Sequence, residues 1–302
     1  MYSSANTVER QSRTLVFSAK IKDYKELIKF RLSAMVVFST ALGFLIASPF
    51  DISWFKLIIL SVSGLAITGA ANAINQIIER DTDALMERTK NRPLVTGRMQ
   101  VSEAVIASII MAVGGLILML IFLNLRSTML AAAGLVIYSF LYTPLKTVNP
   151  IAVIVGGIAG ALPPLSGYIA AVNDFTLMAG ILFAIQFVWQ FPHFWAIAWL
   201  KDEDYANAGI RLLPFESEKG FGTIMAMISF SLVLLPLSVL PSYFNLLSYN
   251  ATILLLAASI LFLMSTIILW IKRSNKAALG VLLGSIAYLP IVLFIFLIDY
   301  LV

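Results

Sequence analysis

The 302-residue sequence contains no cysteine and one histidine, His193. Disulfides, iron–sulfur clusters and thiolate metal sites are therefore excluded, and so is any metal site built from several histidines. Charge is also scarce, because 12% of the residues are Asp, Glu, Lys or Arg, against about 25% in an average soluble domain. Apolar residues make up 60% of the chain, and the mean hydropathy is +0.93. This composition excludes soluble enzymes, disordered chains and nucleic-acid-binding proteins, and the excess of five cations suits an anionic membrane surface.

Nine apolar stretches are long enough to cross a bilayer as helices. The fourth is short, and its end is set by Pro144, Asn149 and Pro150. The predicted fold class is an all-α polytopic membrane protein with nine transmembrane helices around a central cavity. The helices are expected at 32–48, 57–78, 104–123, 128–143, 150–172, 176–199, 223–241, 250–271 and 277–298.

The cations are divided unevenly between the two ends of these helices. With the N-terminus inside, 19 of the 21 Lys and Arg residues fall in inner segments, and only Lys56 and Arg126 fall outside. The positive-inside rule therefore predicts an inner N-terminus and an outer C-terminus. Residues 1–30 are expected to form a basic cytoplasmic tail, and residues 31–302 one nine-helix domain. A bacterial cell (inner) membrane is favoured over a mitochondrial inner membrane, because Glu9 and the short tail argue against a transit peptide.

Two inner connections, 79–103 and 200–222, are longer than the topology requires, and together they hold 18 of the 37 charged residues. An offset of 121 residues aligns them, so that the Asp-x-Asp sequence ending at Asp83 matches Asp202 and Asp204, and Pro93 matches Pro214. This similarity between the two loops is either coincidence in charged segments or the result of an old duplication that places two acidic clusters around one cavity.

A polar stripe follows the second predicted helix into its inner loop. Its members are separated by four, three, four and four residues, so they share one helical face, and such a face inside a bilayer usually borders a cavity. Amide and carboxylate oxygens at this spacing suit a hard cation such as Mg²⁺. The stripe consists of Thr68, Asn72, Asn75, Glu79 and Asp83.

Further charged residues surround this stripe. Asp81 lies close to the three oxygen ligands Asn75, Glu79 and Asp83, and neighbouring cations suit the remaining oxygens of a phosphate group. These features predict a magnesium–diphosphate site at the inner membrane face. The alternative interpretation is an interfacial helix end with solvated charges, which does not explain Asn72 and Asn75 inside the bilayer. The neighbouring cations are Arg80, Arg88, Lys90 and Arg92.

The fifth and sixth helices carry two further patterns. In the sixth, Gln186, Gln190 and His193 form a polar stripe among aromatic residues that include Trp195, which suits a carbocation or a flat macrocycle. The alternative is an ordinary aromatic-rich helix whose histidine hydrogen-bonds a neighbour. The fifth helix has small residues and a proline pair, which indicate either tight packing or a broken helix beside a cavity. Its members are Gly156, Gly157, Gly160, Pro163, Pro164 and Gly167.

These residues together resemble the heme O synthase (protoheme farnesyltransferase) family of UbiA intramembrane prenyltransferases. The resemblance covers nearly all of the chain after residue 25. The superfamily signature Asn-x3-Asp-x3-Asp stands here as Asn75-x3-Glu79-x3-Asp83, within NAINQIIERDTDALMERTKNRPLVTGRM. More specific matches are YTPLK, GALPPLSGY, QFPHFWAIAW and DYANAGIRLLP. Glu79 and Thr147 depart from the family pattern, and the second Asp-x3-Asp is absent, a degenerate form that the heme-directed branch shares.

The resemblance implies transfer of a farnesyl group from farnesyl diphosphate to a vinyl group of heme b, which is a substrate, to give heme O. It implies Mg²⁺ as cofactor, the lipid bilayer as surroundings, and heme A synthase or oxidase assembly proteins as protein partners. Asn75, Glu79 and Asp83 would hold the metal, with Asp81 beside them. Diphosphate would contact Arg80, Arg88, Lys90, Arg92, Lys146 and Lys201, and heme would contact His193, Gln190, Trp195 and Arg211.

Three alternatives remain. An aromatic or quinone-precursor prenyltransferase would predict an intact second Asp-x3-Asp. A secondary transporter would place its polar residues near the membrane midplane, whereas these acidic clusters lie at the inner edge. A structural subunit of an oxidase complex leaves the polar stripe of the second helix unexplained.

Overall fold

The computed structural model describes residues 18–48, 50–214 and 219–301, in which helices and turns occur and no strand does. Arg10, Arg13 and the rest of residues 1–17 of the predicted tail lie outside the described residues, as do 215–218 of the second inner loop. Residues 18–27 are helical and are followed by a turn at 28–29.

Nine helical stretches in the described part of the chain are long and apolar enough to cross a membrane, and their ends fall within three residues of the predicted ones. The fourth is composite, since a π-helical segment, η1, interrupts it. Two short helices, α4 (Arg80–Asp83) and α10 (Asp202–Asn207), lie in the predicted inner loops. The nine are α2 (Phe30–Ala47), α3 (Trp54–Ile78), α5 (Val101–Phe122), α6 (Leu125–Val136) with η1 (Ile137–Tyr142) and α7 (Thr143–Leu145), α8 (Ala152–Val172), α9 (Leu177–Leu200), α12 (Phe221–Tyr243), α13 (Tyr249–Lys272) and α14 (Asn275–Asp299).

Side-chain caps determine where several of these helices begin. In each case a hydroxyl or amide oxygen accepts a hydrogen bond from the backbone N–H three residues later, which satisfies one of the free donors of the first turn. The capping residues are Ser53, Asn124, Thr176, Ser248 and Ser274.

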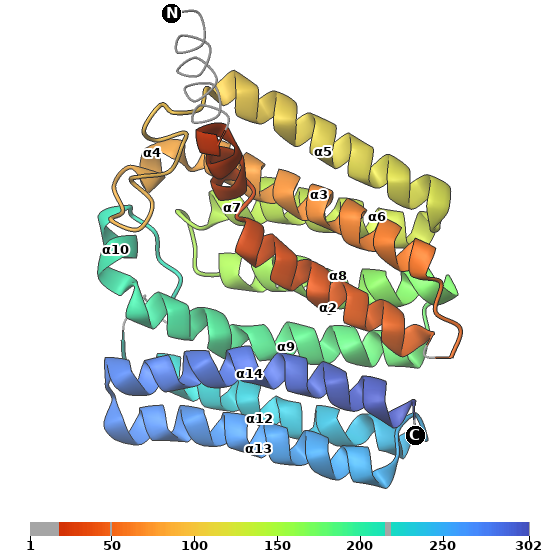
Figure 1. Ribbon diagram of the computed structural model, residues 1–302. Helices are drawn as coiled ribbons and strands as arrows, with labels where there is room; N and C mark the ends of the chain where they lie inside the picture. Colours follow the sequence, from red (N-terminus) through yellow and green to blue (C-terminus); the bar gives the residue numbers. More distant parts are fainter. Residues whose placement is uncertain (1–17, 49, 215–218, 302) are drawn as a thin grey trace, which may run out of the picture.

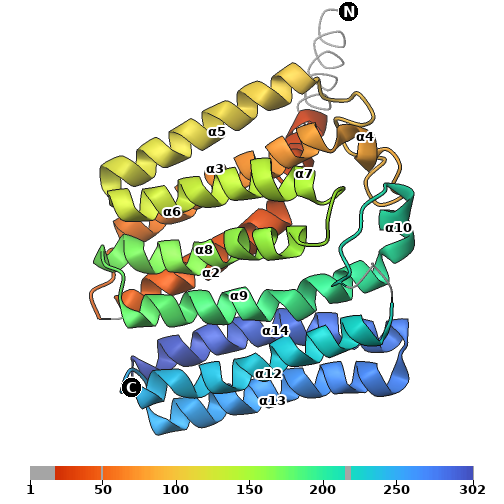
Figure 2. The ribbon, with the colours of Figure 1, turned by 180° about the vertical axis from the view of Figure 1, so that it is seen from behind.

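The long helices lie side by side, with α5 along one edge of the molecule and α12, α13 and α14 along the opposite edge (Figure 1). α8 lies between α2, α6 and α9, and it is the most enclosed span, with 14 of its 21 residues buried. Both views place α4, α7 and α10 at the same end of the bundle (Figures 1 and 2). The two predicted inner loops therefore meet at one end of the bundle.

α2 and α8 approach each other backbone to backbone. A Cβ atom on Gly43 would lie 2.2 Å from the carbonyl oxygen of Pro164, and one on Gly167 would lie 1.9 Å from that of Thr40. α8 continues as one α-helix through Pro163 and Pro164. The predicted break in the fifth helix is therefore wrong, but its predicted position beside a cavity is confirmed, because Gly156, Gly160 and Pro163 line an apolar cavity. Gly167 serves close packing against α2.

Candidate active site

The candidate site lies where α3 passes into α4, next to α7 and the turn that precedes α2. Three oxygen-bearing side chains on one face of this segment are each matched by a cation from another part of the chain. Such pairing is needed because an isolated charge at this depth would lose its hydration without compensation. Lys29 Nζ donates to Asn75 Oδ1 at 2.8 Å, Lys146 pairs with Glu79, and Arg92 pairs with Asp83.

Asp83 is the most enclosed carboxylate of the group, with 1% of its surface exposed. Arg92 contacts its Oδ2 atom, whereas Oδ1 is buried without a hydrogen-bond partner. Burial raises the pKa of Asp83, although the neighbouring Arg92 opposes this. A buried oxygen that lacks a donor is a suitable ligand for a hard cation, so these residues fit the predicted Mg²⁺.

The pKa of Lys29 is shifted in the opposite direction to that of Asp83. Burial lowers its pKa to about 7, and repulsion from Arg92 and Lys146 acts in the same direction. Three cations face the two carboxylates of Glu79 and Asp83, so the cluster has a surplus of positive charge when Lys29 is protonated. A bound diphosphate would relieve that surplus.

Other residues of the predicted first loop lie outside this cluster. The Asp81 side chain is 89% exposed and pairs with Arg80 at 3.2 Å. Lys90 is exposed and donates to Glu87 at 2.7 Å. The helical period explains the separation, because Asp81 is two residues from both Glu79 and Asp83 and so projects from the opposite face of the segment.

The second acidic cluster contacts the first loop. Asp204 accepts a hydrogen bond from the backbone N–H of Glu87 at 2.8 Å, and its other oxygen lies 4.0 Å from Arg88 Nε. Asp202 lies 3.6 Å from Lys219. A polar cavity of about 630 Å³ lies between the loops, and Lys201 is among the residues that line it. Arg211 is exposed and is not among the residues that line this cavity.

These acidic residues do not gather into one metal site. Within the ranges that the structure describes, no three His, Asp or Glu side chains are placed to hold a metal ion together. Asp204 therefore joins the two loops, whereas Asp202 pairs within the second loop, and neither carboxylate lies with Glu79 and Asp83. A metal at that pair would need Asn75, water and substrate oxygens as its further ligands.

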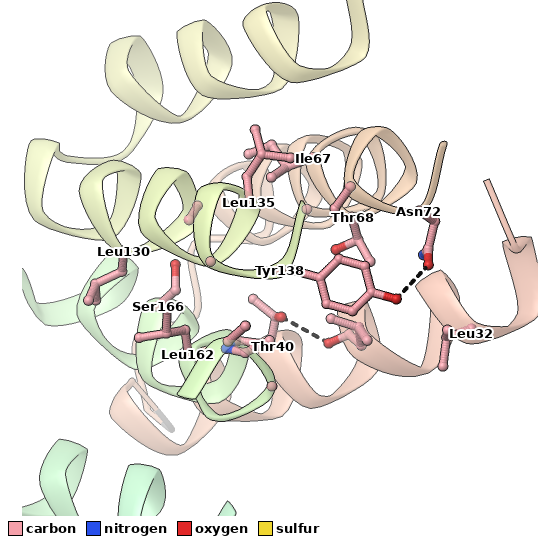
Figure 3. Close-up of a pocket in the computed structure, with 18 of the residues that line it drawn as sticks. Leu32, Thr40, Ile67, Thr68, Asn72, Leu130, Leu135, Tyr138, Leu162 and Ser166 are labelled. Atoms are coloured by element: carbon pink, nitrogen blue, oxygen red, sulfur yellow. Dashed lines mark hydrogen bonds between the residues drawn. The ribbon is translucent and has the colours of Figure 1, made fainter. Parts of the chain in front are cut away.

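An apolar cavity of about 250 Å³ extends into the membrane from this end of α3, between α2, α3, α6, η1 and α8 (Figure 3). Thr68 and Asn72 line it, so the prediction that this face of the second helix borders a cavity is confirmed for both. The Tyr138 hydroxyl lies 3.5 Å from Asn72 Oδ1 (Figure 3). Because Asn72 precedes Asn75 by one helical turn, the polar end of the cavity adjoins the cation–carboxylate cluster.

The predicted heme-contacting residues of α9 lie elsewhere. Gln190 Nε2 donates to the Gly157 carbonyl of α8 at 2.6 Å, and Trp195 is buried in the helix core. His193 Nδ1 lies 2.7 Å from Ser285 Oγ of α14, and its ring stacks on Trp189. The predicted polar stripe is thus divided, since Gln190 faces α8 and His193 faces α14. None of the three lines the apolar cavity.

Sequence reasoning missed Lys29, which it counted as one of many inner cations. It also missed Thr143, whose hydroxyl accepts a hydrogen bond from Asn75 Nδ2 at 3.1 Å. The available signal for Lys29 was its position directly before the first apolar span, where the side chain reaches the membrane face. For Thr143 the signal was its place within the YTPLK motif.

This fold and site define a class: polytopic membrane proteins in which a carboxylate–cation cluster at one membrane face adjoins an apolar chamber. A model of the UbiA prenyltransferase family matches residues 36–297. The chain therefore belongs to the UbiA prenyltransferase family.

Two curated bacterial relatives carry the same name, protoheme IX farnesyltransferase. That of Cytophaga hutchinsonii is 44% identical over 93% of this chain and 99% of its own length. That of Flavobacterium johnsoniae is 39% identical over 95% of this chain and 97% of its own length. These relatives are therefore matched along almost their whole length.

Solved structures share the fold. A digeranylgeranylglyceryl phosphate synthase superposes with a TM-score of 0.78 at 23% identity, covering 93% of this chain and 98% of its own. A UbiA homolog from Archaeoglobus fulgidus, bound to DMAPP and Mg²⁺, superposes with a TM-score of 0.70 at 16% identity, covering 91% and 99%. The predicted all-helical, nine-span architecture is confirmed.

Proposed function

We propose that this chain transfers a farnesyl group from farnesyl diphosphate to a vinyl group of heme b, giving heme O and diphosphate. The observation that carries this proposal is the cluster of Asn75, Glu79 and Asp83 with its cations at the polar end of an apolar cavity. The names of the curated relatives support the choice of acceptor and prenyl donor.

Mg²⁺ is the proposed cofactor, with Asn75, Glu79 and Asp83 as its protein ligands. When bound, it would neutralise charge on the diphosphate leaving group. The buried, unpartnered Oδ1 of Asp83 supports this assignment, as does the Mg²⁺ bound in the Archaeoglobus fulgidus homolog.

The cations of the cluster would hold the diphosphate. Arg92 and Lys146 are proposed to exchange part of their present pairing with Asp83 and Glu79 for diphosphate oxygens. They would stabilise the negative charge that develops as the carbon–oxygen bond breaks. Arg88 and Lys201 border the adjoining polar cavity and are proposed to guide the diphosphate inward. Arg80 and Lys90, which are exposed, would act through their field at longer range.

The apolar cavity would hold the farnesyl chain and exclude water from the allylic cation. The rings of Tyr138 and Tyr142 line the cavity and suit a cation held over their faces. The vinyl group then forms a carbon–carbon bond with C1 of the farnesyl cation. Water adds to the resulting cation on the heme side and loses a proton, which completes the hydroxyethylfarnesyl group.

His193 is proposed as the heme iron ligand. Ser285 contacts Nδ1, so Nε2 is the nitrogen left for iron. Arg211 is proposed to meet a heme propionate, whereas Gln190 and Trp195 would support the site through helix packing. The proposed location is a bacterial cell membrane with the N-terminus inside, and heme A synthase or oxidase assembly proteins are the proposed partners.

Expression in a host that lacks heme O synthesis tests the proposal. We expect heme O by mass spectrometry from the unaltered chain and none from the Asp83→Asn variant at ordinary Mg²⁺. A membrane fraction that contains the protein and heme b but no heme O would refute the proposed acceptor. For the iron ligand, a His193→Ala variant should bind heme b with an altered absorption spectrum, and an unchanged spectrum would exclude that role.

A further inference from the structure

Lys29 adopts a backbone conformation that side chains rarely occupy. It is in the left-handed region, with φ 47° and ψ 56°, at the turn between helical residues 18–27 and α2. Only glycine, and to a lesser degree asparagine, enters this region readily. A lysine is kept there when the surrounding structure fixes it, and such positions gather at functional sites.

Side chains of α3 fix this turn on both sides. Gln76 Nε2 donates to the carbonyl oxygens of Glu26 and Leu27, at 3.0 and 2.6 Å. On the other side, Ser33 Oγ accepts a hydrogen bond from Asn72 Nδ2 at 3.1 Å and donates to the Ile28 carbonyl at 2.7 Å. The position of the Lys29 backbone is therefore set by the helix that carries the metal-ligand candidates.

The Lys29 side chain is directed onto one of those candidates. Its ammonium donates to Asn75 Oδ1 at 2.8 Å, and the Asn75 amide is held in this orientation because Nδ2 donates to Thr143 Oγ1. The Thr143 hydroxyl in turn donates to the Tyr138 carbonyl at 2.8 Å, so it is free to accept from the amide. The Lys29 ammonium is thus placed on the oxygen that a divalent cation would need.

We propose that Lys29 is a positioning residue that makes occupation of the metal site depend on diphosphate. Its ammonium, placed on Asn75 Oδ1, repels a divalent cation. A diphosphate gives the ammonium a new anionic partner and leaves Asn75 Oδ1 to the metal. The two ligands are then coupled through one side chain, and the coupling is reciprocal. This inference rests on the proposed metal–diphosphate site.

The proposal predicts that removing the charge moves two affinities in opposite directions. Without Lys29, a divalent cation alone should bind more tightly, since a repelling charge is gone. Farnesyl diphosphate alone should bind more weakly, since an attracting charge is gone. A residue with a purely structural role would weaken both when it is replaced, so the opposite signs distinguish the two explanations.

The test uses the full chain purified in detergent at pH 6.5. Mn²⁺ binding without diphosphate is followed by the electron paramagnetic resonance of the free ion, and labelled farnesyl diphosphate binding is followed by equilibrium dialysis with EDTA. For Lys29→Gln, which keeps a hydrogen-bond donor, we expect the Kd for Mn²⁺ to fall about tenfold and that for farnesyl diphosphate to rise about tenfold. Lys29→Met should show the same signs.

Two controls accompany these variants. Lys29→Arg keeps the charge and should retain both affinities, and so should Lys25→Gln, an exposed lysine of the same N-terminal helix. Weakening of both ligands in Lys29→Gln, or an unchanged Mn²⁺ affinity, would overturn the proposal for Lys29. If the unaltered chain bound neither Mn²⁺ nor farnesyl diphosphate, the proposed function would fail with it. If Lys29→Gln changed neither affinity as predicted but the unaltered chain made heme O, the Lys29 proposal would fail and the proposed function would stand.

Discussion

Replacing Gly167 by alanine should push α2 away from α8 and destabilise the protein. The added Cβ would lie 1.9 Å from the Thr40 oxygen, 2.8 Å from the Thr40 carbonyl carbon and 3.2 Å from the Phe44 nitrogen. All three are backbone atoms of α2, so no side-chain rotation relieves the overlap. Ordinary contact begins at 3.4 Å, and the helices must therefore separate by about 1.5 Å at this point.

The expected cost follows from this separation. Overpacking in a well-packed interior costs about 1–3 kcal/mol. The added Cβ would clash with the backbone of α2, which cannot rotate away, so the cost belongs at the upper end of that range. At about 2–4 °C per kcal/mol for a chain of this size class, a loss of about 3 kcal/mol corresponds to about 6–12 °C in Tm. Thr40 also lines the apolar cavity, so the affinity for farnesyl diphosphate should fall as well.

Thermal unfolding in detergent, followed by the fraction of protein that remains monodisperse, measures the effect. Gly114→Ala is the matched control, since Gly114 is within α5 and a Cβ there would meet no atom within 4 Å. That variant should be neutral or up to about 1 kcal/mol more stable, because alanine is the better helix former. If Gly167→Ala lost no more Tm than Gly114→Ala, the close approach of α2 and α8 would be refuted.

Three further predictions concern the polar contacts. Arg92→Met should lower the free energy of unfolding of the metal-free protein by about 3–5 kcal/mol, because it leaves the buried Asp83 carboxylate unpaired. Asp83→Asn should lower it less, and equal Tm losses for the two variants would contradict this. Gln190→Ala should cost about 1–3 kcal/mol, since it removes a buried donor to an α8 carbonyl, and an unchanged Tm would show that this contact is dispensable. Ser285→Ala should alter the heme b absorption spectrum through His193, and identical spectra would separate the serine from the heme.

The spans were predictable because lipid imposes a long apolar segment whatever the packing. The interruption of the fourth span was not, since the π-helical residues Ile137–Tyr142 continue the apolar span without a proline or a charge. π-helical segments are frequent at functional sites. Here the segment places Tyr138 and Tyr142 on the apolar cavity, which depends on tertiary structure and leaves no mark in hydropathy.

The candidate site was predictable in part for a similar reason. Helical periodicity groups Asn75, Glu79 and Asp83, and the same periodicity turns Asp81 away, as the structure shows. The spacing of residues in the sequence could not show which cation pairs with each of these three side chains. Lys29 comes from 46 residues before Asn75, so its role depends on how the first turn packs on α3.

The excess of cations in the predicted inner segments has a chemical use as well as a topological one. Lys29, Arg92 and Lys146 all belong to the inner set that the positive-inside rule counts, yet each contacts the oxygen-bearing face of the α3–α4 segment. The positive-inside rule alone requires only exposed cations, such as Lys25. Keeping three of them beside Glu79 and Asp83 costs desolvation, and a diphosphate that enters the site offsets that cost. The charge asymmetry of the sequence therefore favours an anionic substrate at the end of the bundle where α4, α7 and α10 lie.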